Sequence, residues 1–543
     1  MKYKKTVLLA ITLALASVMT QAQDNLSALL PMPQKAICTD SNKCFDMRYA
    51  TVTRNDCSTA PHIAEELSKI IERHTGIEID NNNKKKCRNS IEIVISREKE
   101  REEYNIDIKE RKIVFTGGSE AGIFYAIKTF EQLLLGDVRN SADGKVAQIH
   151  IEDAPRYSYR AVMLDPARHF IPVEDVKSFI DQMSRYKYNV LQLHLTDDQG
   201  WRIEIKSHPE LTRVGAFRNP RGEDNGPDNG FYTQEQIKEL IEYAAKKQVE
   251  IVPELDVPGH SVAILAACPE LGCAFRREEK TVLGNTTNMM LCAASEKAYS
   301  IYEDIIAEVA QLFPSERIHL GGDEAAVKEN WAKCDDCLAL MKSAGYEKPS
   351  QLMNIFFGRL LDIVRKNGKK AILWCELDNM WPPANDYLFP YPNDVTLVTW
   401  RNALTPKCIE LTRKNGHKLI MAPGEHTYLD YPQWHNDLPE FNNWGMPITT
   451  LEQSYALDPG YGLPHEQGQH IMGVMATMWA EAIKNINRVN YMFFPRGLAI
   501  AEAAWSDMER RDWDSFKKRL YPNLYDLMQR GVSFRVPFEI GNK

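Results

Sequence analysis

Short apolar runs alternate with segments of helical spacing along most of this chain. From residue 160 onward, eight runs are only a few residues long and mostly apolar, as expected for strands buried on both faces. Such strands belong to parallel sheets whose crossovers are helices. The predicted strands are Arg160–Leu164, Tyr188–Leu195, Val249–Leu255, Arg317–Leu320, Ala371–Trp374, Val395–Trp400, His417–Ala422 and Ile471–Met478.

Helical patterns separate several of these strands. The segment Val173–Tyr186 opens with acids, and Thr233–Gln236 has the sequence of a capping box. A helix that follows Ser350 is predicted to stop at Gly368. Eight buried strands with helical crossovers predict a (β/α)8 TIM barrel. The alternative is a doubly wound open sheet, but no Gly-rich phosphate loop follows the first strand.

A different pattern precedes the barrel. Residues 23–155 read as a small α/β (α+β) domain, in which strands pack under two helices. Asp153-Ala154-Pro155 marks the predicted junction with the barrel domain, residues 156–543. The first domain shows no catalytic constellation, and we interpret it as a support domain. Its predicted elements are the strands Ile91–Ser96, Tyr104–Lys109 and Lys112–Thr116 and the helices Pro61–Arg73 and Ser119–Leu135.

Residues 1–22 have the features of a bacterial secretory signal peptide. Lys2, Lys4 and Lys5 precede an apolar run at Val7–Met19 that is too short for a comfortable membrane span, and Ala22 is a small residue at the cleavage site. We expect an exported protein that is periplasmic, secreted or at the cell surface. The alternative is an uncleaved N-terminal anchor. No later stretch of the sequence is long and apolar enough to span a membrane.

Charge and cysteine content narrow the range of partners and compartments. The 543 residues carry a formal net charge of −8 without a basic tract, which argues against nucleic acid as a partner. Eleven cysteines fit an oxidising compartment. Cys334 and Cys337 form a C-x-x-C with no second such pair or nearby His, which favours a disulfide or free thiols over a zinc site. The groups that could form local disulfides are Cys38/Cys44, Cys57/Cys87 and Cys268/Cys273/Cys292.

The carboxyl ends of the predicted strands carry charged and aromatic residues. In a (β/α)8 barrel the active site lies at these ends. Acids together with tryptophans indicate a sugar site, because indole faces pack on the C–H surfaces of the ring and carboxylates bind hydroxyls. The residues at these ends are Asp165, Arg168, His169, His194, Asp197, Asp198, Glu254, Asp256, His260, Asp323, Glu324, Trp374, Glu376, Trp400, Tyr428, Asp430, Trp479 and Glu481.

The sequence lacks the residue patterns of a metal site, a phosphate site or a serine hydrolase. His194, His260 and His319 stand singly, without the spacing of metal ligands. Only Arg168 would suit a phosphate, and the G-x-S-x-G of a serine hydrolase is absent from the sequence. The sequence therefore predicts no metal and no cofactor, and it predicts a glycan substrate.

Asp323 and Glu324 follow Gly321-Gly322 at the end of the fourth predicted barrel strand. Two carboxylates that flank a glycosidic bond make a glycosidase, but the side chains of adjacent residues diverge at a strand end. An acid and a nucleophile facing each other across the sugar cannot simply be assumed. A substrate-assisted reaction fits better, in which the neighbouring acid holds a group of the substrate that serves as the nucleophile.

These residues resemble glycoside hydrolase family 20, the β-N-acetylhexosaminidases, over nearly the whole chain after the signal peptide. The segment His319–Glu324 is similar to the central motif of that family. Other matching segments are Asp165–Phe170, His194–Gln199, Pro253–His260 and Trp479–Glu481. The resemblance implies an N-terminal α/β domain before a barrel, a retaining reaction without a metal, and a substrate with a terminal β-linked N-acetylhexosamine.

The resemblance also implies a role for each site residue. Glu324 would be the general acid and then the base, and Asp323 would orient the 2-acetamido group and stabilise an oxazolinium intermediate. Tyr428 would hydrogen-bond the acetamido carbonyl, and Asp197 and His260 would form a relay that keeps Glu324 protonated. The implied sugar-binding residues are Trp374, Trp400 and Trp479 around the acetamido methyl and the sugar face, Arg168 at the 3- and 4-hydroxyls, and Asp430 and Glu481 at the 4- and 6-hydroxyls.

Three functions remain open on the sequence. The first is an exo-acting β-N-acetylhexosaminidase for GlcNAc or GalNAc. The second is an enzyme of the same family that releases a disaccharide, which would need a roomier pocket than Asp430 and Glu481 suggest. The third is a non-catalytic glycan-binding protein, which would be expected to lack the Asp-Glu pair or Tyr428. Association into a homo-oligomer is also left open.

Overall fold

The structure is a computed structural model that describes residues 26–54, 61–79, 88–136, 141–218, 228–277, 288–376, 391–435, 437 and 445–540. The predicted signal peptide and the pair Cys57/Cys87 lie outside these residues. The chain divides into two compact units. The first contains the chain up to Arg156, the short segment Arg185–Lys187 and the residues from Ala501 onward, and the second contains Tyr157–Ser184 and Tyr188–Ile500.

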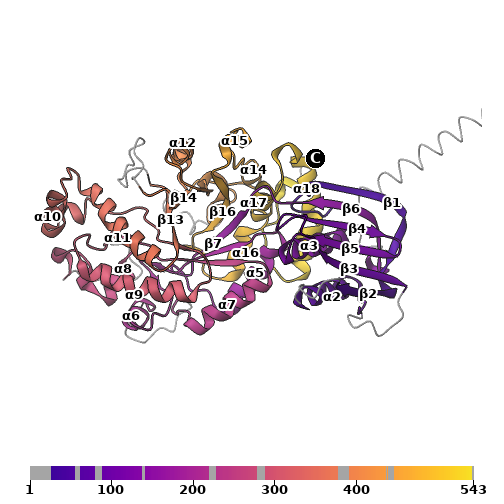
Figure 1. Ribbon diagram of the computed structural model, residues 1–543, viewed down its shortest axis with the longest axis horizontal. Coiled ribbons are helices and arrows are strands. Elements are labelled where there is room, and N and C mark those ends of the chain that lie inside the picture. The colour runs from indigo at the N-terminus through magenta and orange to yellow at the C-terminus, as the bar shows by residue number, and fades with distance from the viewer. Residues whose placement is uncertain are drawn as a thin grey trace, which may run out of the picture. The chain divides into compact units, whose positions relative to one another are not determined.

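The first unit is built on a six-stranded sheet with the strand order β1-β6-β4-β5-β3-β2 (Figure 1). The strands β2, β3 and β5 run parallel, and the other pairs are antiparallel. The elements are β1 (Lys35–Asp46), β2 (Ala50–Arg54), α2 (Pro61–Thr75), β3 (Asn89–Ile95), β4 (Tyr104–Lys109), β5 (Lys112–Gly117), α3 (Glu120–Gly136), β6 (Lys145–Asp153) and α18 (Trp513–Gln529).

Alternating burial sets the core of this unit. Residues of β3, β4 and β5 alternate between the core and the more accessible face, and the inward ones pack against α2 and α3 in one apolar cluster. The predicted strands and helices of this domain are confirmed. The strands β1, β2 and β6 were not predicted; β1 carries polar residues throughout its length, and β2 is short.

A buried lysine ties distant parts of the first unit together. The Lys187 ammonium donates to an Asp153 carboxylate oxygen at 3.0 Å and to the Tyr104 hydroxyl at 2.8 Å. The same ammonium lies 4.3 Å from the centre of the Trp505 ring. The Trp505 indole N–H donates to Asp153 at 3.0 Å. A buried charge of this kind is tolerated only while its partners remain.

The second unit is the predicted (β/α)8 barrel. Among the described residues, eight parallel strands close in the order β11-β12-β13-β14-β15-β16-β7-β8. All eight predicted barrel strands are confirmed, with ends shifted by up to two residues. The strands are β7 (Tyr159–Leu164), β8 (Val190–His194), β11 (Glu250–Glu254), β12 (Arg317–His319), β13 (Lys370–Trp374), β14 (Thr396–Thr399), β15 (Leu419–Met421) and β16 (Ile471–Met478).

Helices and short elements fill the connections of the barrel. A two-stranded ribbon of β9 (Thr196–Asp197) and β10 (Gly200–Trp201) follows β8. The predicted capping box at Thr233 is confirmed, since its hydroxyl accepts from Gln236 N while the Gln236 side chain accepts from Thr233 N. The helices are α5 (Val173–Arg185), α6 (Glu210–Gly215), α7 (Gln234–Lys246), α8 (Val262–Ala267), α9 (Glu296–Leu312), α10 (Asp335–Ser343), α11 (Leu352–Lys366), α12 (Thr405–Asn415), α13 (Gly424–Thr427), α14 (Leu451–Tyr455), α15 (His465–Gly468), α16 (Ile486–Phe493) and α17 (Arg496–Trp505).

Among the helices in the described part of the chain, none has the length and apolar character that crossing a membrane requires.

Replacing Lys187 by Met is expected to lower the free energy of unfolding by about 3–5 kcal/mol, because it leaves the buried Asp153 carboxylate without its cation. Urea unfolding followed by circular dichroism measures the change. The matched control is Lys112→Met, which removes a half-exposed ion pair with Glu92 and should cost less than about 1 kcal/mol. Equal effects of the two substitutions would contradict this account of the buried lysine.

Candidate active site

The predicted site residues gather at the carboxyl ends of the barrel strands, where the geometry of the fold requires them. Arg168 follows β7, Asp197 lies on the ribbon after β8, and His260 follows β11. Asp323 and Glu324 follow β12. The remaining predicted residues come from the next four strand ends: Trp374 from β13, Trp400 from β14, Tyr428 and Asp430 from β15, and Trp479 and Glu481 from β16.

The turn after β12 depends on a glycine. Gly321 has φ +64°, and a Cβ atom there would lie 1.7 Å from Oδ1 of Asp256. The same carboxyl oxygen accepts from the backbone N–H of Gly322 at 3.2 Å. Asp256, for which the sequence suggested no role, therefore supports the turn that presents the two acids. Burial and the nearby Asp323 raise the pKa of Asp256 well above its usual range.

The two adjacent acids occupy different environments. The Asp323 side chain is 10% exposed and that of Glu324 is 50% exposed. Burial raises the pKa of Asp323, and the nearby His260 opposes this shift. No donor among the described residues reaches Asp323 Oδ1, although this atom is buried. The predicted divergence of the two side chains is therefore present.

Asp197 is the centre of a buried hydrogen-bond network. Its carboxylate lies 2.9 Å from Arg168 Nη2, 2.7 Å from His194 Nε2 and 3.2 Å from His260 Nδ1. Burial favours its neutral form, yet Arg168 and the two histidines hold the pKa of Asp197 well below its usual range. Asp197 is thus ionised at neutral pH, and three cationic or hydrogen-bonding groups stabilise its charge.

His260 connects Asp197 to the two acids. Its Nε2 lies 3.7 Å from Asp323 Oδ2 and 3.8 Å from Glu324 Oε2. Burial alone lowers the pKa of His260, but nearby carboxylates, Asp197 first among them, raise it well above its usual range. The structure therefore brings together the predicted series Asp197, His260 and Glu324, with the last contact longer than a hydrogen bond.

Arg168 contacts Oδ2 of Asp197, whereas His260 contacts Oδ1. The Arg168 guanidinium also bonds Asp165 at 3.1 Å and lies 3.9 Å from Glu481. Burial raises the pKa of Glu481, and Arg168 opposes this shift. Asp430 is also buried, and burial together with Glu481 raises its pKa well above the usual range. These acids and the arginine make a polar corner that suits sugar hydroxyls.

The predicted aromatic residues form a continuous wall. The Trp374 and Trp479 ring centres are 5.7 Å apart, and those of Tyr428 and Trp479 are 6.4 Å apart. Trp400 packs in the same apolar cluster as Tyr428 and Trp479. Trp374 is only 2% exposed and also packs in the barrel core, so it contributes to the core as well as to the site.

Three residues without a predicted role are part of this arrangement. Glu254 accepts hydrogen bonds from the Trp374 indole at 2.9 Å and from Gln192 at 2.8 Å, and histidines lower its pKa to about 2 against the effect of burial. Arg401 stacks 3.9 Å over the Trp400 ring and bonds Glu376 at 3.1 Å. Glu254 and Glu376 could have been found from their strand-end positions, whereas Arg401 carried no signal.

A pocket of about 390 Å³ opens beside Glu324. It is lined by His260, by Glu376 and Arg401, and by residues of the loops that follow β11 and β12. Glu324 therefore borders open space, whereas Asp323 is not among the residues that line this pocket.

Three groups of site side chains have ligand atoms close enough together to hold a metal ion. Each group contains His194 or His260 together with aspartates. Asp197, which belongs to two of these groups, already has the guanidinium of Arg168 at 2.9 Å. A fourth group, of four cysteines, lies outside the site and is described below.

A closed (β/α)8 barrel with acids and tryptophans at the carboxyl ends of its strands is the architecture of a glycoside hydrolase. The model of the glycosyl hydrolase family 20 catalytic domain matches residues 157–508, and that of domain 2 of the family matches residues 26–154. The chain belongs to glycosyl hydrolase family 20.

Relatives and solved structures agree with this assignment. A β-hexosaminidase of Akkermansia muciniphila is 36% identical over 437 residues, which are 79% of this chain and 85% of that protein. A β-hexosaminidase of Porphyromonas gingivalis is 34% identical over 80% of this chain and 55% of its own length. The family 20 exo-β-N-acetylglucosaminidase of Vibrio harveyi in complex with N-acetylglucosamine superposes with a TM-score of 0.80 and is 29% identical over 95% of this chain and 79% of that one.

His260 is expected to titrate well above its ordinary pKa of 6.5 in the folded protein, and Asp197→Asn should lower that pKa. Because the pKa is raised on folding, this stabilisation is complete below pH 6.5 and is lost as the pH rises through the folded-state value. NMR of histidine-labelled protein measures both values. The control is Asp107→Asn, which removes a carboxylate from His150 and should leave His260 unchanged. An unshifted His260 in Asp197→Asn would contradict the network.

Proposed function

We propose that this glycoside hydrolase is a retaining exo-β-N-acetylhexosaminidase that removes terminal β-linked GlcNAc or GalNAc by substrate-assisted catalysis. The observation that carries the proposal is the contrast between its two adjacent acids. Glu324 is half-exposed beside an open pocket, whereas Asp323 is buried with one carboxyl oxygen unpartnered among the described residues. One acid can reach the leaving group, and the other can reach only a substituent that is inserted deeply.

A 2-acetamido group is a substituent of the required chemistry. Its N–H can donate to the Asp323 carboxylate, and its methyl group can enter the apolar wall of Trp374, Trp400 and Trp479. The Tyr428 hydroxyl, which belongs to the same aromatic cluster, can donate to the acetamido carbonyl oxygen. These contacts hold the carbonyl oxygen as an internal nucleophile below C1 of the sugar.

The reaction then proceeds in two balanced steps. In the first, Glu324 donates its proton to the glycosidic oxygen, the bond from C1 to that oxygen breaks, and the acetamido oxygen bonds to C1. The resulting oxazolinium cation is stabilised by Asp323. In the second step, water attacks C1 as the oxazolinium bond breaks, and Glu324 takes the proton from that water. Two inversions at C1 retain the β configuration.

Arg168, Asp430 and Glu481 support an exo-acting reaction on a single sugar. Their polar groups gather beside Trp479 of the aromatic wall, where they can bind the outer hydroxyls of a terminal residue. Release of a disaccharide would need room for a second sugar beyond these hydroxyls. The pocket of about 390 Å³ lies instead beside Glu324, where it can receive the leaving group.

The relatives support the same substrate class, because the matched enzymes carry the names β-hexosaminidase and exo-β-N-acetylglucosaminidase.

We extend the proposal to the location of the protein on the basis of the N-terminal segment. Lys2, Lys4 and Lys5 before the apolar run favour export from a bacterial cell.

Release of 4-nitrophenol from its β-GlcNAc, β-GalNAc and β-glucose conjugates tests the proposal directly. We expect cleavage of the acetamido sugars but not of the glucoside, because glucose has no internal nucleophile. A thiazoline mimic of the cyclised intermediate should inhibit competitively. Cleavage of the glucoside at a comparable rate would rule out the substrate-assisted reaction, and release of only a disaccharide from a longer conjugate would favour the alternative enzyme.

Replacing each of the two acids by its neutral amide is expected to affect catalysis and inhibitor binding differently. Glu324→Gln should lower kcat by about 10²–10⁴-fold with little change in the affinity for product sugar, because general acid catalysis is lost. Asp323→Asn should also lower kcat and in addition weaken thiazoline binding. The matched control is Glu410→Gln, an exposed acid on α12 that does not line the pocket and should keep its activity. Full activity of Glu324→Gln would overturn its assignment.

A further inference from the structure

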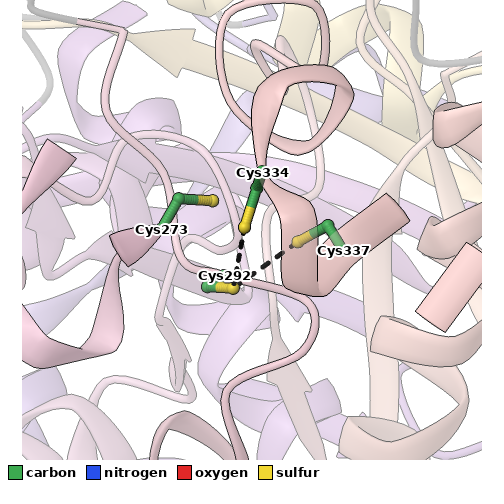
Figure 2. Close-up of side chains that lie close together, drawn as sticks. All are labelled: Cys273, Cys292, Cys334 and Cys337. Carbon is green, nitrogen blue, oxygen red and sulfur yellow. Dashed lines mark hydrogen bonds between the residues drawn. The ribbon is translucent and has the colours of Figure 1, made fainter. Parts of the chain in front are cut away.

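Four buried cysteines converge in the second unit (Figure 2). Cys273, Cys292, Cys334 and Cys337 are each at most 2% exposed. Their sulfur atoms all lie within 4.8 Å of one another. The C-x-x-C therefore has the two further partners that were not apparent from sequence spacing.

The sulfur separations match one shared centre better than two disulfides. Cys292 Sγ lies 3.5 Å from Cys337 Sγ and 4.0 Å from Cys334 Sγ. A disulfide requires about 2.05 Å between sulfurs. Four thiolates around a tetrahedral zinc ion, each about 2.3 Å from the metal, are separated by about 3.8 Å. The distances from Cys292 Sγ to two other sulfur atoms are therefore close to those expected between ligands of one zinc ion.

The backbone holds these cysteines in place. Cys334 is the N-cap residue of α10 and makes no side-chain capping bond, and Cys337 lies in the first turn of that helix. Cys292 N donates to Leu271 O at 2.9 Å, which holds the segment of Cys292 beside the segment that carries Cys273. The Trp331 indole donates to Leu291 O at 2.8 Å and so joins the segment before Cys334 to the segment of Cys292.

We propose that Cys273, Cys292, Cys334 and Cys337 bind one structural zinc ion. Zinc is the ion that a buried tetrahedral set of four thiolates suits, and a closed set leaves no open position for catalysis. Cys273 and Cys292 belong to the loop after β11, and Cys334 and Cys337 belong to the loop after β12. The ion would therefore cross-link these two loops.

The cross-link bears on the pocket beside Glu324. Asn288 and Met289 of the first loop and Ala325–Glu329 of the second loop line this pocket. Zinc would hold both walls at a fixed separation from outside the pocket, without contacting a sugar. In an oxidising compartment the ion would also keep the four sulfurs from pairing as disulfides.

The metal content of the full chain, purified without chelators, tests the proposal. Elemental analysis should find one zinc per chain, and X-ray absorption at the zinc edge should show four sulfurs at about 2.3 Å. These readouts need no substrate, so they stand apart from the proposed hydrolase reaction. Absence of zinc after incubation of reduced protein with zinc sulfate, iron in its place, or disulfides among the four cysteines in peptide mapping would each overturn the proposal.

Variants localise the ion. Cys292→Ser and Cys337→Ser should lose the zinc, whereas Cys268→Ser should retain it. Cys268 is a matched control, because it is also buried on the loop after β11 and its sulfur lies outside the cluster, 3.9 Å from Glu210. In Cys337→Ser, hydrogen exchange should increase at residues 288–295 and 325–337. If that variant does not fold, X-ray absorption at the zinc edge of the wild-type chain still shows whether four sulfurs bind the ion. Retention of zinc in both cluster variants would refute the assignment.

Discussion

The active-site end of the barrel depends on the cost of burying the Asp197 carboxylate. An ionised carboxylate is tolerated in a protein interior only with close cationic or hydrogen-bonding partners. Arg168, His194 and His260 supply them at 2.9, 2.7 and 3.2 Å. These partners come from different strand ends, so the requirement of one buried charge fixes the relative positions of Arg168, which we propose to bind the sugar, and of the histidine beside the two acids.

The barrel makes this convergence possible. Parallel strands end at one face, so residues separated by hundreds of positions meet there without long connections. The same geometry separates two adjacent acids, because the turn at Gly321 places Asp323 toward the interior and Glu324 toward the pocket. This difference in exposure between neighbouring residues underlies the two chemical tasks that we propose for them.

The pocket walls have a different origin. They come from the loops after β11 and β12, whose described residues form short helices and isolated bridges before the next long helix. Such loops need fixed points if they are to keep a defined shape. The described residues show two kinds of fixed point. One is a hydrogen bond such as that from Trp331 to Leu291, and the other is the convergence of four cysteine sulfurs. Neither contacts the active site, yet both bear on the space beside Glu324.

The sequence alone determined the barrel and which residues gather in most of the candidate site, because both depend on local pattern. Apolar runs of strand length located all eight barrel strands, and their carboxyl ends located Asp197, His260, Asp323 and Glu324. Strands with mixed alternation, such as β1, were missed because packing outweighs local preference there. Tertiary structure alone decided the role of Asp256 beneath the turn, the stacking of Arg401 on Trp400, and the meeting of Cys273 and Cys292 with the C-x-x-C. Each is a contact between residues distant in the chain or on irregular loops, and spacing along a sequence does not record such distances.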